Sequence, residues 1–264
     1  MKKTLRTLSL FAVLALALSM LNCPSRQSSQ PVKADITVAD DGSGDYESIG
    51  DAIDEAKDGD VILVKAGTYE EEVEVGEDAG SLTLIGEGPG KTILDADGEY
   101  AALTLKSDGC RVSGFTLKGG ESHGLYIPNG HQSIDHCLII DNGDRGAYLS
   151  TMSGGGTAEF NHCTIADNKV SAIYHANDEP GTRLTNCILA FNGRSLVFDG
   201  DGKNIAVTGS CLYSDDEDSD TPPKASRCIR KDPKFRNHES GDYRLKSGSP
   251  CIGAGTDGEN MGCF

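Results

Sequence analysis

Basic residues are scarce in this chain, tryptophan is absent, and no long apolar run occurs after Leu21. The 24 Lys and Arg residues are outnumbered by 41 Asp and Glu residues, which gives a formal net charge of −17. This excess of negative charge disfavours binding to nucleic acid or to an anionic lipid surface, because such partners are recognised by clustered Lys and Arg. A polyanionic sugar would need a metal ion between itself and the protein. The sequence after Leu21 is nowhere apolar enough to predict a membrane-spanning helix.

The N-terminus is typical of an export signal. Lys2, Lys3 and Arg6 precede an apolar run that extends from Leu8 to Leu21. The segment Leu18–Cys23 resembles a bacterial lipoprotein signal, which implies lipidation of Cys23, although Asn22 stands where a small residue is expected. We therefore predict a signal peptide at residues 1–22, a flexible tether at 23–34 and a bacterial cell-envelope location. A lipid anchor would be the only membrane contact, and the alternative is a secreted or periplasmic protein.

One pattern of residues occurs four times between residues 112 and 199. The copies are Val112–Gly120, Ile134–Asn142, Phe160–Asn168 and Leu184–Asn192. Their alignment produces a column of Phe115, Cys137, Cys163 and Cys187, and a second column of Tyr126, Tyr148, Tyr174 and Phe198. Both columns have spacings of 22, 26 and 24 residues. Repeats of this length, with alternating apolar and polar residues and no helical period, are typical of a parallel β-solenoid.

Each coil of such a solenoid has interior, exterior and turn positions. We predict that the cysteine column faces the interior and that the tyrosine column faces outward. A third column contains Gly120, Asn142, Asn168 and Asn192, and its composition predicts a repeated turn in the left-handed conformation. Apolar residues at helical spacing predict an amphipathic helix over residues 46–57, which would cap the first coil.

The pattern from Asp35 to Phe264 resembles the right-handed parallel β-helix superfamily, which includes pectate lyases, pectin methylesterases and polygalacturonases. The resemblance implies an all-β, single-stranded right-handed parallel β-helix with an N-terminal capping helix. Its expected parts are an N-terminal cap at 35–60, coils at 61–213, and an acidic loop with a C-terminal cap at 214–264. The opening stretch, including the spacing Gly67-x-Tyr69-x-Glu71, is similar to that of pectin methylesterases.

Catalytic motifs of these enzymes are not recognisable in the sequence. The resemblance implies that a methylesterase needs two aspartates and an arginine on one sheet face, in motifs that also contain tryptophan, and nothing after Glu71 follows them. A Ca²⁺-dependent lyase needs carboxylates for the metal ion and an Arg or Lys base. Charged residues that could converge beside the tyrosine column are weak catalytic candidates: His123, Asp144 and Arg145. His175 and Asp199 are aligned on successive coils in the same repeat pattern, and they are weak candidates for an acid–base pair. Each can also be explained as a polar residue at a solvated turn or strand end.

The tyrosine column suggests contact with a glycan, because outward aromatic rings offer flat surfaces for sugar rings. Our first hypothesis is a non-catalytic, lipid-anchored, monomeric protein that binds polysaccharide or another envelope component through Tyr126, Tyr148, Tyr174 and Phe198. Stabilising contacts between neighbouring strands would explain the same column without a ligand. A Ca²⁺-dependent polysaccharide lyase or a glycoside hydrolase acting on uronate-type glycans is the second hypothesis. A structural or adhesive repeat protein is the third.

Cysteines and possible metal ligands complete the set of candidate sites. Four late cysteines allow three pairings, and proximity in sequence favours Cys211–Cys228 and Cys251–Cys263. The acidic residues Asp215, Asp216, Glu217 and Asp218 are weak candidates for binding Ca²⁺, the one cofactor that the sequence suggests. His136 and His162 occupy equivalent positions in successive repeats, but the sequence shows no third ligand for a metal ion.

Overall fold

The computed structural model describes residues 33–150, 154–176, 180–214, 222 and 224–264. The predicted signal peptide, the lipidation site Cys23, most of the predicted tether and the acidic candidates Asp215, Asp216, Glu217 and Asp218 lie outside the described residues. Within the described ranges, no helix is long and apolar enough to cross a membrane.

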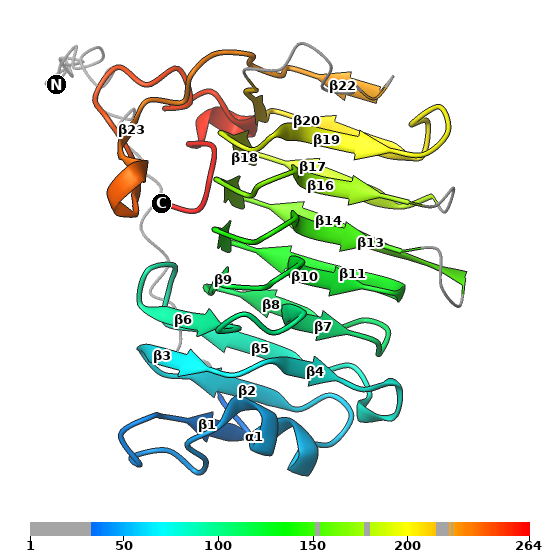
Figure 1. Cartoon of the computed structure of the whole chain (residues 1–264), viewed down its shortest axis with the longest axis vertical. Coiled ribbons are helices and arrows are strands. Elements are labelled where there is room, and N and C mark those ends of the chain that lie inside the picture. The colour runs from blue at the N-terminus through cyan, green and yellow to red at the C-terminus, as the bar shows by residue number, and fades with distance from the viewer. Residues whose placement is uncertain (1–32, 151–153, 177–179, 215–221, 223) are drawn as a thin grey trace, which may run out of the picture. The chain divides into compact units, whose positions relative to one another are not determined.

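Residues 34–264 form a parallel β-solenoid of seven coils, which lie on one another along the long axis of Figure 1. Each complete coil contributes one strand to each of three parallel sheets. The nine-stranded sheet contains β1 (Ile36–Val38), β2 (Val61–Val64), β5 (Thr83–Gly86), β8 (Arg111–Ser113), β11 (Asn129–Asp135), β14 (Gly155–Asn161), β17 (Thr182–Thr185), β20 (Ile205–Thr208) and β22 (Lys224–Ser226). The seven-stranded sheet contains β3 (Gly67–Glu70), β6 (Thr92–Asp95), β9 (Thr116–Lys118), β12 (Leu138–Ile140), β15 (Thr164–Ala166), β18 (Ile188–Ala190) and β21 (Cys211–Leu212). The six-stranded sheet contains β4 (Val73–Val75), β7 (Ala101–Leu105), β10 (His123–Ile127), β13 (Arg145–Leu149), β16 (Ser171–His175) and β19 (Arg194–Phe198).

The predicted interior file of cysteines is confirmed. Cys137, Cys163 and Cys187 are fully buried in the core. The amide of Thr164 donates to the Cys137 carbonyl at 2.9 Å, and the amide of Ile188 donates to the Cys163 carbonyl at 2.8 Å. These bonds place the three cysteines in the same position of consecutive coils, where they pack as small apolar residues.

The asparagine column is also present, but its role differs from the prediction. The left-handed residues of the repeated turn are the preceding ones, Asp141 (φ 54°), Asp167 (φ 52°) and Phe191 (φ 58°). The side chains of Asn142, Asn168 and Asn192 are instead buried and form a hydrogen-bonded ladder through the coils. The prediction that these asparagines have left-handed backbones was wrong. Asn is preferred in this column because its buried side-chain amide donates hydrogen bonds to carbonyls of the turn.

The capping helix α1 extends over Ile49–Glu55 and is shorter than predicted. It begins late because Tyr46 pairs with Val38 in a β-bridge, and Ser48 is the N-cap residue. Ile49, Ala52 and Ile53 are buried against the first coil.

Glu71 holds the N-terminus of α1 in place. Its carboxylate accepts hydrogen bonds from the Ile49 amide at 2.8 Å, the Gly50 amide at 3.1 Å and the Ser48 hydroxyl at 2.9 Å. A negative charge at this position satisfies amides that have no partner within the helix and interacts favourably with the helix dipole.

We expect Glu71→Gln to lower the free energy of unfolding by about 2 kcal/mol, because an amide –NH₂ would face donors and the charge would be lost. Urea denaturation followed by circular dichroism measures this change. Glu74→Gln is the matched control, since Glu74 forms an exposed ion pair with Lys106, whose loss should cost less than about 1 kcal/mol. Equal losses in the two variants would contradict the capping role.

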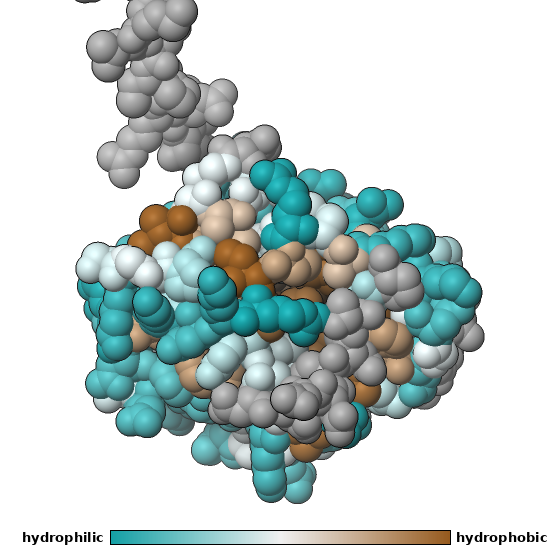
Figure 2. All heavy atoms as spheres, turned by 90° about the horizontal axis from the view of Figure 1, so that it is seen from above, coloured by the Kyte–Doolittle hydropathy of each residue, from teal (hydrophilic) through white to brown (hydrophobic). Residues whose placement is uncertain are grey.

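The C-terminal segment folds back over the outer side of the seven-stranded sheet. It contains the antiparallel strands β23 (Phe235–Asn237) and β24 (Asp242–Leu245) and the short 3-10 helices η3 (His238–Ser240) and η4 (Thr256–Gly258). Another 3-10 helix, η1 (Glu77–Ala79), follows β4 in the first coil. The apolar side chains of the C-terminal segment form a second core with residues of the seven-stranded sheet: Leu138, Ile140, Ala166, Ile188, Ala190, Cys211, Phe235, Tyr243, Cys251, Met261 and Cys263. Seen along the long axis, this end of the molecule exposes mostly hydrophilic residues with separate apolar ones between them (Figure 2).

The cysteines of this region do not meet in the pairs predicted from sequence proximity. All eight cysteines in the described residues are free thiols. The Cys211 thiol is hydrogen-bonded to that of Cys251, and this contact together with burial raises the pKa of Cys211. The Cys263 amide lies against Thr164, and burial raises the pKa of the Cys263 thiol to about 12. Sequence proximity misled because the C-terminal segment returns across earlier coils.

Candidate active site on the six-stranded sheet

Polar and aromatic side chains gather on the outer face of the six-stranded sheet. Strands β10, β13 and β16 begin with His123, Arg145 and Ser171, which are aligned with one another, and Arg194 of β19 continues the row. We call these four residues the polar row. A tyrosine follows three positions later on each of the first three strands, and Tyr126, Tyr148 and Tyr174 are likewise aligned.

Two consecutive inward positions put both rows on the same face. Leu125 is fully buried in the core. A Cβ atom at the neighbouring Gly124 would lie 2.5 Å from Asn142 Nδ2 and from Ile139 Cγ2, so this position also faces the interior. Strict strand alternation would have placed His123 and Tyr126 on opposite faces.

The three tyrosines form the outward ladder that the repeat predicted. Their ring centroids are 5.5 and 5.7 Å apart, and neighbouring rings are tilted by only 15° and 14°. Tyr100, from the preceding coil, contacts Tyr126 edge-on at 5.7 Å. The result is a continuous aromatic surface across four coils.

Phe198 does not belong to this ladder. Tyr174 is aligned with Val197, and Phe198 is aligned with His175. The turn between Asn192 and β19 is one residue shorter than the turn between Asn168 and β16, and this shifts the last strand by one position. The predicted alignment assumed turns of equal length.

Arg145 lies against the tyrosine ladder. Its guanidinium carbon is 5.1 Å from the ring centroid of Tyr148 and 4.7 Å from that of Tyr174. The guanidinium also forms an ion pair with Asp144. Stacking and ion pairing therefore hold one cation in a defined position on the aromatic surface.

His123 is the buried member of the polar row. Its ring centroid lies 4.9 Å from that of Tyr148 and 5.2 Å from that of Tyr100, and Nδ1 has no hydrogen-bond partner among the described residues. Burial, and secondarily the nearby Arg145 charge, lower the pKa of His123 to about 4. The imidazole is therefore neutral at neutral pH. The structure brings together the predicted candidates His123, Asp144 and Arg145, whose catalytic role stays a prediction.

The other two catalytic candidates are not a pair. His175 is buried in the interior column of Ile127 and Leu149. Asp199 lies after the end of β19, where it accepts a hydrogen bond from the Tyr174 hydroxyl at 2.8 Å. Their predicted alignment fails because of the same one-residue shift that displaces Phe198.

Ser171 is not among the site residues predicted from the sequence. It lies in the polar row between Arg145 and Arg194, is 1% exposed, and its hydroxyl has no hydrogen-bond partner among the described residues. The repeat pattern could have identified Ser171, because it aligns this residue with His123 and Arg145.

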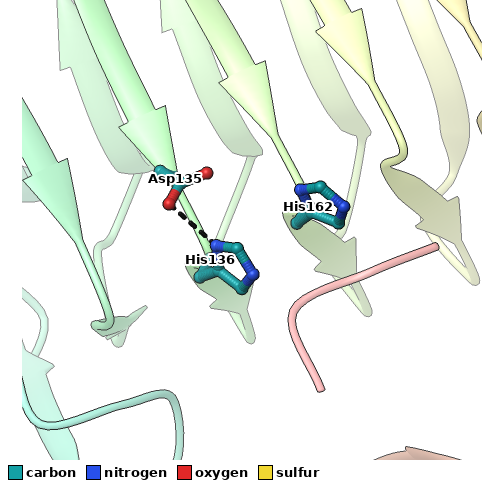
Figure 3. Close-up of side chains that lie close together, drawn as sticks. All are labelled: Asp135, His136 and His162. Carbon is teal, nitrogen blue, oxygen red and sulfur yellow. Dashed lines mark hydrogen bonds and ion pairs between the residues drawn. The ribbon is translucent and has the colours of Figure 1, made fainter. Parts of the chain in front are cut away.

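A group of three side chains that could hold a metal ion occurs in the described part of the chain, away from this face. It consists of Asp135, His136 and His162 (Figure 3).

Residues 35–120 match the family model described as Pectinesterase, and residues 93–217 match the model of a right handed beta helix region. The second match agrees with the topology, and the solenoid is a right-handed parallel β-helix. The pectinesterase match covers α1 and β1–β9 and ends before His123, so the candidate site lies outside it.

Sequence relatives carry pectinesterase names. Probable pectinesterase/pectinesterase inhibitor 23 of Arabidopsis thaliana is 40% identical over 216 residues, which are 69% of this chain and 37% of that protein. Probable pectinesterase/pectinesterase inhibitor 58 of Arabidopsis thaliana is 33% identical over 209 residues, which are 69% of this chain and 37% of that protein. The chain spans 11% to 37% of the length of eight such relatives. Among solved structures, the pectin methylesterase from Aspergillus niger has a TM-score of 0.43 and 18% identity, over 77% of this chain and 82% of that one.

These matches correct the first functional hypothesis. The sequence predicted a non-catalytic protein without recognisable pectin methylesterase or pectate lyase catalytic motifs, and the match over residues 35–120 together with the pectinesterase relatives contradicts that prediction. The lyase, hydrolase and adhesive alternatives find no support among these sequence relatives.

Proposed function

We propose that this chain is a carbohydrate esterase that hydrolyses methyl-esterified uronate units of a pectin-type polysaccharide. The substrate would lie across the tyrosine ladder, with one ester group over the polar row. The observation that carries the proposal is the assembly of Arg145, Asp144 and a neutral His123 beside three aligned tyrosines. The pectinesterase match in the coils before this site supports the choice of ester chemistry.

Charge supports an esterified rather than a free-acid substrate. The chain has a net charge of −17, which disfavours a polyanion. A methyl-esterified uronate is neutral, and stacking of its sugar rings on Tyr126, Tyr148 and Tyr174 requires no charge. Hydrolysis creates carboxylates, so the product would be repelled from the surface that held the substrate.

The side chains present can perform ester hydrolysis without a further group. Neutral His123 accepts a proton from a water molecule, whose oxygen then bonds to the ester carbonyl carbon. The Arg145 guanidinium stabilises the negative charge that develops on the carbonyl oxygen. When the bond to the methoxy oxygen breaks, the proton held by His123 passes to that oxygen, and methanol and a carboxylic acid are released. The acid then loses its proton to solvent and becomes a carboxylate. Asp144 keeps the guanidinium oriented through the ion pair.

The direct test is incubation of the full chain with methyl-esterified polygalacturonate. We expect methanol and new carboxylate to be released in equal amounts, without unsaturated products or new reducing ends. Unsaturated products would indicate elimination, and new reducing ends would indicate glycoside hydrolysis; either would contradict the proposal. Polysaccharide binding without methanol release would contradict it as well.

The pH dependence tests the role of His123. Its pKa is lowered to about 4, so the base form is present above that pH and is lost as the pH falls through it. We therefore expect kcat/KM for methanol release to fall on acidification with an inflection near pH 4. An inflection near pH 6.5, the value of an ordinary imidazole, would contradict a buried His123 with a lowered pKa as the base.

Location and anchoring stay predictions of the N-terminal sequence. An exported protein would meet cell-wall polysaccharide, so export and the proposed substrate are compatible. The bacterial envelope, the lipid on Cys23 and the monomeric state have no further support in the described residues.

A further inference from the structure

A second cluster of reactive side chains lies at the corner where the nine-stranded sheet leads into the seven-stranded sheet. Asp135 ends β11, and His136 follows it at the corner. His162 follows β14 on the next coil in the same position. Both histidines have left-handed backbones, with φ of 47° and 48°, so their side chains project from the same corner (Figure 3).

The two imidazole rings stack on each other with centroids 4.8 Å apart and a tilt of 15°. Asp135 Oδ2 lies 2.8 Å from His136 Nδ1. One ligand atom from each of Asp135, His136 and His162 lies within 4.8 Å of the other two. The sequence shows no third ligand beside the histidines, and the structure supplies one.

A fourth potential ligand comes from the C-terminal segment. Glu259 Oε2 lies 2.9 Å from His162 Nε2, although the two residues are 97 positions apart in sequence. This contact exists because the C-terminal segment folds back across the coils, as in the second core.

We propose that Asp135, His136 and His162 bind a divalent transition-metal ion, with Zn²⁺ the best match. Glu259 contacts His162 but lies outside this group of three, and rotation of its exposed side chain would make it the fourth ligand. Two imidazoles and two carboxylates form a ligand set that suits Zn²⁺, whereas Ca²⁺ and Mg²⁺ prefer oxygen ligands alone. The two carboxylates also balance the charge of the ion. Zn–ligand distances of about 2.0–2.2 Å require the ligand atoms to move closer together. The side chains of His136 and Asp135 are 51% and 45% exposed, so rotation can supply that movement.

The chain itself supplies conservative replacements for the ligands. Asn186 occupies the same corner on the coil after His162 and also has a left-handed backbone, with φ of 55°. Asn161 is aligned with Asp135 on the neighbouring strand. His136→Asn, His162→Asn and Asp135→Asn therefore remove ligands while introducing a residue that the fold accepts at an equivalent position.

The experiment is titration of the full chain, first stripped with a chelator, with Zn²⁺ in competition with a chromophoric indicator. We expect one Zn²⁺ per chain, a loss of affinity of more than about 100-fold in His136→Asn and His162→Asn, and a loss of about 10- to 100-fold in Asp135→Asn. His131→Gln is the matched control, since His131 lies on the same strand as Asp135 but outside the cluster. The Zn²⁺ affinity of this variant should equal that of the unmodified chain. Melting temperatures without metal would show that each variant is folded.

Two further measurements separate this site from other sources of binding. Co²⁺ at the site should show the visible absorption of a tetrahedral ion with nitrogen and oxygen ligands. Zn²⁺ should raise the melting temperature less in Glu259→Gln than in the unmodified chain, because binding stabilises the folded state that holds all four ligands. Thiolate charge-transfer bands with Co²⁺, equal weakening in His131→Gln, or no stoichiometric binding would each overturn the proposal. None of these readouts depends on esterase activity.

Discussion

Arg145→Ala is expected to reduce kcat for methanol release by about 10²- to 10³-fold, the largest effect on activity that the structure predicts. The guanidinium is the one cation placed between Tyr148 and Tyr174 and beside Asp144 in the described residues of this face. Its removal leaves the developing oxyanion without its stabilising charge. Because stabilisation of the transition state is lost, kcat should fall much more than KM rises. Initial rates over a range of substrate concentrations measure both quantities.

Two variants control for this result. Arg145→Lys keeps the charge but lacks the planar group that stacks on the tyrosines, so we expect an intermediate loss. Arg183→Ala removes an exposed arginine that is paired with Glu159 on the nine-stranded sheet, and activity should not change. If Arg145→Ala retained full kcat, the proposed site would be wrong even if the chain proved to be an esterase.

Asn168→Ala is expected to lower the free energy of unfolding by about 3–5 kcal/mol, the largest effect on stability. The Asn168 side chain donates to the carbonyls of Ile139 and Ala166, and to Asn192 Oδ1 at 2.9 Å. Its own carbonyl oxygen accepts from Asn142 Nδ2 at 2.8 Å. Truncation would leave several of these groups buried without a partner in the middle of the ladder, where water cannot replace it.

Urea denaturation measures the loss, and Asn161→Ala is the matched control. Asn161 lies on the same coil and is half-buried, and its backbone carbonyl rather than its side chain accepts the hydrogen bond from the His136 amide. We expect this variant to lose less than about 1 kcal/mol. Similar losses in both variants would show that the coil tolerates no substitution, rather than that the ladder is stabilising.

The region that matches the pectinesterase model contains residues that stabilise the first coil, whereas the residues of the proposed chemistry lie after that region. Within the matched region, Glu71 caps α1, and the Tyr69 hydroxyl donates to the Lys65 carbonyl at 3.1 Å. Tyr69 and Glu71 of the Gly67-x-Tyr69-x-Glu71 spacing thus stabilise the first coil. The esterase proposal therefore depends on His123, Asp144 and Arg145, which come after the match, and on the rate measurements that test them.

The sequence alone determined the solenoid and the contents of its repeating columns. Equal spacings in two independent columns required coils stacked in register, and this placed Cys137, Cys163 and Cys187 inside and Tyr126, Tyr148 and Tyr174 outside. These features were predictable because each depends on the local period of the chain, which every coil repeats.

Only the tertiary structure decided the alignment of the last coil and the residues that meet across coils. A turn shortened by one residue moved Phe198 out of the tyrosine ladder, and two consecutive inward positions put His123 beside Tyr126. The return of the C-terminal segment brought Cys211 to Cys251 and Glu259 to His162. None of these features is periodic, because each depends on a single turn length or on a contact between distant segments, and a repeat pattern contains no information about either.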